Sequence, residues 1–427
     1  MRPTIDVSPL AHSLPLVRPA LIDTPAAPST PVTSVTPATL APAMPSVLFV
    51  DQSGQLGGAE FALLQLAGSC TSRSQVVLLS DGPFRARLEA LGARVDVLND
   101  ARVSGVVRQG SCLNCLRAVP GILRQVRAIA SRARDFDVLF LNTQKALVLG
   151  ALGKPLHRKP VIWYQHDILT REHFGRVQLG VVKWLVRFAV DQVVANSKAS
   201  AQSLAALTGV AVDTVPVIYN GIDAGAFSRV AGTNMAALRR RLGLPEHAWV
   251  AGLFGRLAPW KGQHIALDAL ARLPGVHLVL VGAPLFGEDA YAQRLHQQAE
   301  QLGIADRVHF AGFQDDVPAW MKAMDVILHT STEPEPFGRV IVEGMAAARP
   351  VIAAAAGGVT EIVRHRHNGW LVKPGDVAAL ADAIEALRAE PALAQRLAAQ
   401  ALADAQNEFS VDQYLQRMTQ AIGQAAR

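Results

Sequence analysis

The sequence predicts an α/β protein with two doubly wound parallel sheets, each in its own domain. Its 427 residues are too many for one ordinary core, and 50% of them are hydrophobic. Short β-branched runs alternate with amphipathic stretches, and the pattern breaks once, at a turn-rich segment, before it restarts. Uninterrupted apolar strands separated by helices indicate parallel sheets that are covered on both faces. The restart indicates a second sheet of the same kind.

The first 45 residues are predicted to form a disordered extension. Ten of the chain's 25 prolines lie there, mixed with Ser, Thr and Ala, and the segment has no uninterrupted apolar core of the kind that a secretory signal has. In a rival interpretation Ala41, Pro42 and Ala43 form a cleavage site, but prolines and charges interrupt the segment before them. We therefore expect the chain to stay in the cytoplasm.

The first sheet is expected in an N-terminal domain of residues 46–230. Its five strands are predicted at 47–50, 75–80, 137–142, 160–167 and 192–197. The turn-prone stretch "VPVIYNGIDAGAFS" (215–228) then leads to a C-terminal domain of residues 231–408. Five further strands are predicted there, at 250–255, 276–282, 308–313, 325–330 and 350–355.

The last segment, residues 409–427, has apolar side chains at helical spacing and no strand after it. It is predicted to be a helix that packs back toward the N-terminal domain. Two open sheets that face one another leave a cleft at the carboxyl ends of their strands, where ligands of α/β folds bind. This cleft is the predicted ligand site.

Composition excludes several classes of protein. No uncharged apolar run reaches the roughly 18 to 20 residues of a membrane-spanning helix. Three cysteines argue against a disulfide scaffold, and Cys112 and Cys115 lack the second ligand pair that a structural zinc site needs. We expect no bound metal and no nucleic-acid partner.

The net charge of +6 is unevenly distributed along the chain. Residues 46–230 hold 21 Lys and Arg against 13 Asp and Glu, or +8, whereas the residues after 230 hold 18 basic and 20 acidic residues, or −2. A basic first domain suggests that it faces an anionic partner. The alternative is an ordinary solvated basic face.

The stretch "EPEPFGRVIVEGMAAARP" (333–350) places glutamates around a Pro-Phe-Gly turn in front of an apolar helix. Pro336 and Gly338 put Glu335 in the loop, whereas Glu343 falls one or two turns into the helix. Helix amides between them suit a diphosphate, and carboxylates suit the hydroxyls of sugars. The stretch predicts a sugar-nucleotide site, with helix capping by the acidic residues as the alternative.

A second motif, "GRLAPWKG" (255–262), follows the first strand of the C-terminal domain. Arg256 and Lys261 can meet a diphosphate, the guanidinium through a fork and the ammonium as a point charge. Fixed cations aimed at a leaving diphosphate lower the barrier without Mg²⁺. The alternative is two exposed basic residues after a strand.

Together these motifs give the sequence a likeness to a known family. "GRLAPWKG", "EPEPFGRVIVEGMAAARPVIA" and "GGVTEIV" resemble the retaining glycosyltransferases of family 4, which have the GT-B fold. The likeness extends over nearly the whole chain after about Ser46, through "GQLGGAEFALLQLA", "YQHD", "VVANSKAS" and "VIYNGID". It implies two Rossmann-like domains, the first binding the acceptor and the second the nucleotide sugar.

The resemblance implies roles for the charged residues. The family's paired glutamates match Glu335, for the transferred sugar, and Glu343, for the ribose, while Glu333 lies outside the spacing and is interpreted as loop surface. The family's diphosphate-binding pair matches Arg256 and Lys261.

The resemblance also implies roles for uncharged positions. The family's histidine near the transferred carbon matches His166 of "YQHD", which taken alone would be a structural histidine beside a strand end. The remaining positions that approach the donor match Gly57, Gly58, Gly255, Gly282, Phe337 and Gly338. Ala283 and Pro284 depart from the family pattern, so the nucleotide base stays unidentified.

The activity implied by the resemblance is transfer of a hexose from a UDP- or GDP-sugar to a hydroxyl, with retention of configuration and without metal or cofactor. The acceptor would be lipid-linked or a polysaccharide, in cell-envelope glycan or exopolysaccharide synthesis. The basic first domain fits peripheral contact with anionic lipid at the inner face of the cytoplasmic membrane. Two alternatives stay open: a sugar-nucleotide epimerase of the same fold, and a non-catalytic sugar-nucleotide-binding protein.

Overall fold

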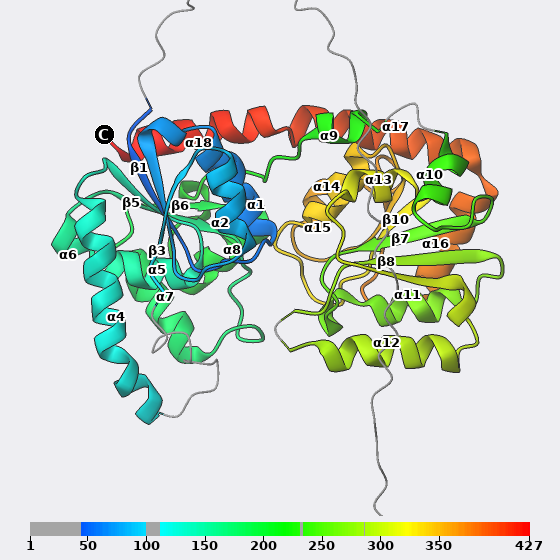
Figure 1. Cartoon of the computed structure of the whole chain (residues 1–427), viewed down its shortest axis with the longest axis horizontal. Coiled ribbons are helices and arrows are strands. Elements are labelled where there is room, and N and C mark those ends of the chain that lie inside the picture. The colour runs from blue at the N-terminus through cyan, green and yellow to red at the C-terminus, as the bar shows by residue number, and fades with distance from the viewer. Residues whose placement is uncertain (1–43, 100–111, 231–233, 286) are drawn as a thin grey trace, which may run out of the picture. The chain divides into compact units, whose positions relative to one another are not determined.

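The computed structural model describes residues 44–99, 112–230, 234–285 and 287–427, with side chains in the first helix after the gap described from Val119 onward (Figure 1). The extension predicted at 1–45 therefore lies outside the described residues, apart from its last two. The described chain forms two six-stranded sheets in which all strands are parallel. The α/β fold class with two doubly wound sheets is confirmed.

The first sheet has the strand order β3-β2-β1-β4-β5-β6. Its strands are β1 (Val47–Asp51), β2 (Ser74–Leu78), β3 (Arg94–Val97), β4 (Val138–Leu141), β5 (Val161–Gln165) and β6 (Gln192–Ala195). Five of them were predicted and β3 was missed. The sequence of β3, "RVDV", alternates charged and apolar residues because the strand lies at the edge of the sheet, where half of its side chains need no burial.

The second sheet repeats this order as β12-β11-β10-β7-β8-β9. Its strands are β7 (Trp249–Phe254), β8 (Val276–Val281), β9 (Val308–Gly312), β10 (Val326–His329), β11 (Val351–Ala354) and β12 (Trp370–Val372). The missed strand, β12, is again an edge strand and is only three residues long. In both sheets the order reverses between the first and the fourth strand, which is the topological switch point of this class of fold.

Helices connect the strands and cover both faces of each sheet (Figure 1). Around the first sheet they are α1 (Gly58–Gly68), α2 (Pro83–Ala90), α4 (Cys112–Ala133), α5 (Gln144–Leu152), α6 (Lys154–His157), α7 (Arg176–Phe188) and α8 (Lys198–Thr208). The later helices are α9 (Ala224–Ser228), α10 (Met235–Arg241), α11 (Gln263–Leu270), α12 (Asp289–Gln301), α13 (Val317–Lys322), α14 (Arg339–Ala346), α15 (Val359–Ile362), α16 (Val377–Ala389), α17 (Pro391–Glu408) and α18 (Val411–Ala425). None of the described helices is long and apolar enough to cross a membrane.

The strands of the first sheet are apolar along their whole length because both faces are buried. Along β1, Val47 and Phe49 point into a core that includes α1 and α18, while Leu48 and Val50 point into a second core that includes α4, α5 and α7. All four side chains are fully buried. Burying a side chain of this size contributes about 1.5–3 kcal/mol each, so the continuous apolar run stabilises both layers at once.

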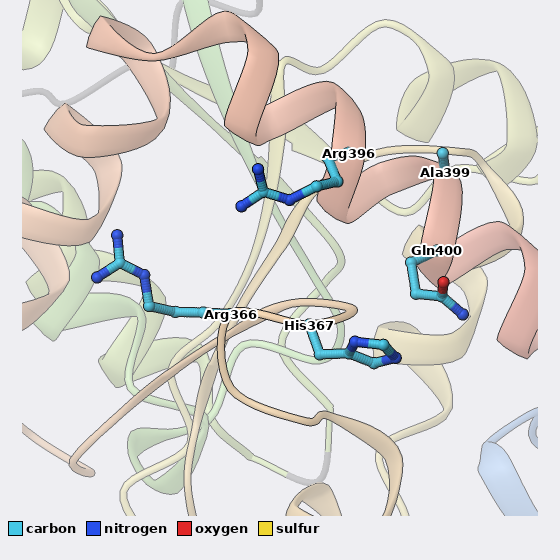
Figure 2. Close-up of a pocket in the computed structure, with 5 residues that line it drawn as sticks. All are labelled: Arg366, His367, Arg396, Ala399 and Gln400. Atoms are coloured by element: carbon cyan, nitrogen blue, oxygen red, sulfur yellow. The ribbon is translucent and has the colours of Figure 1, made fainter.

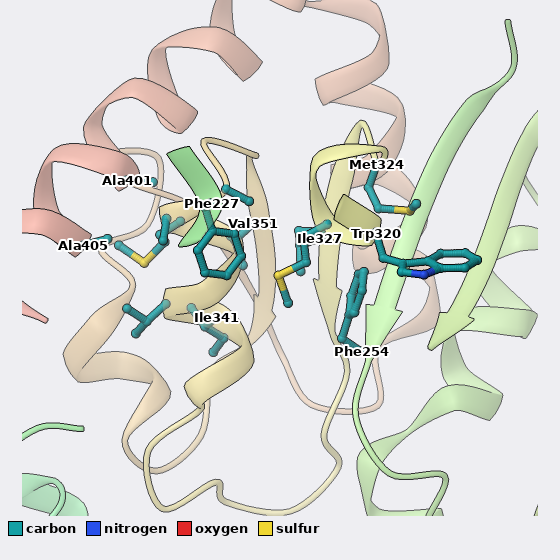
Figure 3. Packing of buried hydrophobic residues seen from close by; sticks show 14 of the residues in the cluster. Phe227, Phe254, Trp320, Met324, Ile327, Ile341, Val351, Ala401 and Ala405 are labelled. Carbon is teal, nitrogen blue, oxygen red and sulfur yellow. The ribbon is translucent and has the colours of Figure 1, made fainter. Parts of the chain in front are cut away.

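The second sheet is packed in the same way. Figure 3 shows one of its cores, in which Phe254 of β7 and Ile327 of β10 meet Trp320 of α13 and Ile341 of α14. Ala401 and Ala405 of α17 close this core from the far side of α14. Small alanines at this spacing let α17 lie close against α14, which carries the predicted site glutamate Glu343.

The chain passes between the two packed halves at two places. Ile218 still packs in a core of the first sheet, whereas Ile222 and Phe227 already belong to a core of the second. The chain returns with α18, whose Tyr414 is buried against the first sheet and donates a hydrogen bond of 3.0 Å to the carbonyl oxygen of Ala62. The boundaries predicted at 230/231 and 408/409 stay predictions.

Candidate active site

Polar residues gather at the switch point of the first sheet, in the places where β1, β4 and β5 end. Asp51 is the last residue of β1, Asn142 follows β4 directly, and His166 follows β5 directly. Because these neighbouring strands run parallel, their carboxyl ends meet at one edge of the sheet. Asp51 and Asn142 are fully buried there.

A hydrogen-bonded chain of side chains holds His166. Its Nε2 lies 3.0 Å from Oδ1 of Asn142, whose Nδ2 donates to Oδ2 of Asp51 at 2.6 Å and to the carbonyl oxygen of Ala59 at 3.1 Å. Since the amide nitrogen of Asn142 is committed as donor, its Oδ1 accepts and His166 carries its proton on Nε2. The other ring nitrogen, Nδ1, is buried and has no hydrogen-bond partner within the described part of the chain.

Burial lowers the pKa of His166 to about 3, so the imidazole is neutral at physiological pH. Its ring rests on Tyr164 with the centroids 4.1 Å apart, and Tyr164 in turn stacks on Tyr414 of α18 at 6.3 Å. A neutral ring with an unused acceptor nitrogen is suited to accept a hydrogen bond from a hydroxyl group.

Two carboxyl groups, Asp51 of this hydrogen-bonded network and Glu60 of α1, have raised pKa values. Burial raises the pKa of Asp51 to about 6, against the lowering effect of its hydrogen bond from Asn142. Burial, and after it the charge of Asp51, raises the pKa of Glu60 in the first turn of α1 to about 8. Glu60 is therefore largely protonated near neutral pH and can donate a hydrogen bond.

The predicted glycines Gly57 and Gly58 lie at the start of α1, with Gly57 as the N-cap. A Cβ atom on Gly57 would lie 2.8 Å from Oε2 of Glu60, whereas one on Gly58 would meet nothing within 4 Å. Gly57 leaves room for the buried carboxyl group, and Gly58 borders open space.

The second cluster lies at the switch point of the second sheet and is centred on Glu335. Its two carboxylate oxygens accept hydrogen bonds of 2.9 and 2.8 Å from Nζ of Lys261. Oε2 also accepts from Ser331 Oγ at 3.0 Å and lies 3.3 Å from Nε2 of His329. Burial alone would raise the pKa of Glu335, but the ammonium of Lys261 and the hydrogen bond from His329 outweigh it and hold the pKa well below its ordinary value. Glu335 is ionised.

The basic motif begins at Gly255, where the ends of strands β7 and β8 lie close together. Gly255 and Gly282, after β7 and β8, have φ values of +131° and +148°. A Cβ atom on Gly282 would lie 2.0 Å from the carbonyl oxygen of Gly255, so a side chain there would displace the backbone. Arg256 follows Gly255, and its carbonyl oxygen accepts a hydrogen bond of 2.9 Å from Nε2 of the buried Gln263.

The glutamates of the 333–350 stretch do not cap α14. Its N-cap is Gly338, with a φ of +99°, and no side chain accepts from the first turn. Glu335 lies in the preceding loop, and Glu343 lies in the second turn, where its Oε1 accepts a hydrogen bond of 2.7 Å from Nε of Arg339. The capping alternative is therefore wrong.

Phe337 and Gly338 precede α14 as predicted. Phe337 is buried, and its ring stacks on Tyr219 with the centroids 5.9 Å apart. Among the described residues, neither backbone amide of this pair donates a hydrogen bond to a protein acceptor. Both amides remain available to an anionic ligand.

Two further glutamates link the halves of the chain, although the sequence predicted no site role for either of them. The carboxylate of Glu361 accepts from the backbone amides of Lys198 and Ala199, at 2.7 and 2.8 Å, and from the hydroxyl of Tyr219 at 3.1 Å. Glu333, interpreted from the sequence as loop surface, is exposed, yet its Oε2 lies 2.6 Å from Nε2 of His173. Both glutamates connect loops around the second sheet to the first domain.

One pocket lies away from these clusters. It measures about 440 Å³ and is lined by Arg366, His367, Arg396, Ala399 and Gln400. Figure 2 shows the two arginine side chains extending away from those of His367 and Gln400. The pocket contains none of the predicted site residues. Among the residues that the structure describes, no group of three or more His, Cys, Asp or Glu side chains is arranged to hold a metal ion.

The chain matches two family models. Residues 56–225 match "Glycosyltransferase Family 4", and residues 234–404 match "Glycosyl transferases group 1". Together they cover the second sheet and, apart from β1 with Asp51, the first sheet as well.

Solved structures match over a larger share of the chain. The complex of Anabaena HepE with UDP-glucose is 39% identical, with a TM-score of 0.80, and the match covers 89% of this chain and 100% of that one. HepE has also been solved with UDP, and with UDP and glucose.

Curated relatives match over part of their length. The lipopolysaccharide core biosynthesis glycosyltransferase LpsE of Rhizobium meliloti is 38% identical over 189 residues, 43% of this chain and 54% of the relative. The D-inositol 3-phosphate glycosyltransferase of Streptomyces bingchenggensis is 34% identical over 219 residues, 49% of this chain and 48% of the relative. The matched region thus spans about half the length of these curated relatives.

Proposed function

The chain belongs to glycosyltransferase family 4 and has the GT-B fold, and on this premise we propose that it transfers a hexose from a nucleoside diphosphate sugar to an acceptor hydroxyl, retaining the anomeric configuration. The observation that carries the proposal is the partly buried, ionised Glu335 held by Lys261 at the switch point of the second sheet. An ionised carboxylate accepts hydrogen bonds from sugar hydroxyls, and a fixed cation beside it stabilises a diphosphate.

The proposed donor is UDP-glucose. The sequence left UDP- and GDP-sugars open, and the support for UDP comes from HepE, which is 39% identical over nearly its whole length and was solved with UDP-glucose.

In the proposed reaction Lys261 and Arg256 stabilise the leaving diphosphate. An ammonium has three N–H donors, and two of those of Lys261 are directed at Glu335, which leaves the third for a phosphate oxygen. Trp260 supports the ammonium, whose nitrogen lies 4.2 Å from the ring centroid. Charges fixed before the reaction need no reorganisation when the diphosphate gains negative charge, so we propose that no metal ion is required.

His166 and Glu335 are proposed to hold the transferred sugar from the two domains. The neutral His166 would accept from a hydroxyl through Nδ1, and Glu335 through an oxygen. Glu343, now paired with Arg339, would hold the ribose. The acceptor attacks the face from which the diphosphate departs, the departing phosphate takes its proton, and orientation supplies much of the rate.

The acceptor is proposed to bind the first domain and to be lipid-linked or a polysaccharide. The excess of 21 basic over 13 acidic residues in 46–230 suits a phosphorylated acceptor at an anionic membrane face. Each well-placed Lys or Arg contributes about 1 kcal/mol to such binding. The lipopolysaccharide core function of LpsE supports this choice of acceptor class.

Thermal unfolding with UDP, GDP and ADP in parallel tests the donor. A ligand that binds only the native state raises the melting temperature by mass action. We expect UDP to raise it most, and Lys261→Ala to abolish the rise. Equal shifts by all three nucleotides, or no shift at all, would contradict the proposed donor.

The epimerase and the non-catalytic binder differ from a transferase in their products. An epimerase converts the donor sugar without an acceptor, and a binder leaves the donor intact. NMR of the donor after incubation with and without a glycan acceptor separates the three, because only a transferase makes release of UDP depend on the acceptor.

A further inference from the structure

Helix α7 (Arg176–Phe188) is apolar on two opposite sides. One side packs into the core under the first sheet through Leu179, Val182, Leu185 and Val186. The other side bears four apolar side chains that are 82%, 38%, 53% and 66% exposed: Val177, Val181, Trp184 and Phe188. Their spacing of four, three and four residues places them in one row along the helix.

Basic residues form a second row beside the first. Arg176, Lys183 and Arg187 each precede a member of the apolar row by one residue, and all three are exposed. The helix contains no acidic residue. Within the described part of the chain, none of the three basic side chains takes part in an ion pair.

The exposed aromatic residues are paired on the surface. The rings of Trp184 and Phe188 lie 5.8 Å apart between centroids, one turn of helix from each other. A soluble helix normally places polar residues on its outer side, so an outward row of this kind marks an interaction surface.

An anionic bilayer fits this surface better than a second copy of the chain. Trp and Phe beside Lys and Arg are typical of helices that lie in the membrane interface. A two-fold self-contact through the apolar row would bring the unpaired basic rows of the two copies near one another, which repulsion opposes.

We propose that the outer side of α7 docks the enzyme on an anionic lipid surface, with Val177, Val181, Trp184 and Phe188 inserted among the acyl chains and Arg176, Lys183 and Arg187 on the headgroups. The proposal rests on the proposed function only in that a lipid-linked acceptor would be found at such a surface. Donor binding by the second domain does not depend on it.

Flotation of the full chain with vesicles tests the proposal. We expect recovery with phosphatidylcholine vesicles that contain phosphatidylglycerol and much less with phosphatidylcholine alone. The double variant W184S/F188S should lower the partition coefficient at least about tenfold. The charge reversal K183E/R187E should lower the partition coefficient by at least about fivefold for each reversed residue. Equal recovery with both kinds of vesicle would contradict the proposal.

Matched controls lie on the second domain. Phe313 is 64% exposed, and Arg272 and Arg396 are also exposed. F313S therefore removes an exposed aromatic side chain outside α7, and R272E/R396E reverses two exposed basic charges outside α7. These variants should float like the wild type, and an equal loss from them would overturn the assignment to α7. W184F should still bind while losing the quenching of Trp184 fluorescence by brominated lipid, and unchanged quenching would also overturn it.

Two readouts separate failure of this proposal from failure of the proposed function. The UDP-induced thermal shift, measured without vesicles, should be the same in W184S/F188S as in the wild type. Light scattering without lipid should show one oligomeric state for both proteins. A change of state in the variant would identify the surface as a contact between copies and contradict lipid docking.

Discussion

His166 depends on residues that no single motif contains. Asn142 and Asp51 hold its ring, yet they lie 24 and 115 positions earlier in the chain. The motif "YQHD" predicts the histidine, whereas its partners become neighbours only because β1, β4 and β5 lie side by side. Polar residues at three strand ends were the available signal, and spacing alone could not pair them.

Asn142→Ala should lower kcat by about 10- to 100-fold, because loss of a partner that orients a functional ring typically costs this much. The melting temperature in the presence of UDP should rise as in the wild type, since UDP is proposed to bind the second domain. Asn407→Ala, at an exposed position of α17, is the matched control. A normal kcat in Asn142→Ala would show that Asn142 does not position His166.

Glu60 makes stability depend on pH. Its pKa is raised from its ordinary 4.5 to about 8, so the native state holds the proton more tightly than the unfolded chain. The resulting stabilisation is full below pH 4.5 and is lost as the pH rises through about 8. Between pH 5 and pH 8 the wild type should therefore lose about a few kcal/mol of its free energy of unfolding relative to Glu60→Gln. Denaturation curves at both pH values measure this, and parallel behaviour of the two proteins would refute it.

Among the strands, every interior strand and the edge strands β6 and β9 were predictable, whereas the edge strands β3 and β12 were not. β1, β4, β7 and β10 lie inside their sheets and are buried on both faces, which leaves an uninterrupted apolar run in the sequence. β3 alternates charged and apolar residues, and β12 is only three residues long, so neither shows a long apolar run. The start of α14 at Arg339 was predictable because Pro336 and Gly338 exclude an earlier one.

The contact between the ends of β7 and β8 leaves no room for one additional methyl group. Gly282→Ala would place Cβ 2.0 Å from the carbonyl oxygen of Gly255, and φ is +148° there. We expect a loss of about 3 kcal/mol or more in the free energy of unfolding, from strain and overpacking together. Gly243→Ala is the control, because φ is +69° but nothing lies within 4 Å, and about 1–2 kcal/mol is expected. Equal losses in urea denaturation would show that close packing plays no part.

At the scale of the whole molecule, the C-terminal helix supports the site from a distance. Tyr414 of α18 stacks on Tyr164, and the ring of Tyr164 contacts the ring of His166. The sequence predicted that this helix would pack toward the first domain, because its apolar residues recur at helical spacing. It could not predict which side chain the helix would support, since that depends on how the two ends of the chain meet in space.

Tyr414→Ala should remove about 3–5 kcal/mol of stability, as loss of a fully buried aromatic side chain does. Tyr414→Phe keeps the ring and removes only the hydrogen bond to Ala62, so about 1–3 kcal/mol is expected from the unpaired carbonyl group. Guanidinium unfolding of both variants measures the difference. If the two variants lost the same stability, the packing of the ring against Tyr164 would contribute nothing.

We propose that the ionised Glu335, held by Lys261, positions the transferred sugar. Its most direct test is the single-turnover rate of transfer from UDP-glucose in Glu335→Gln, which keeps the size of the side chain and removes its charge. We expect a rate lower by about 10² or more, with the UDP-induced thermal shift retained. Transfer at the wild-type rate in Glu335→Gln would contradict it.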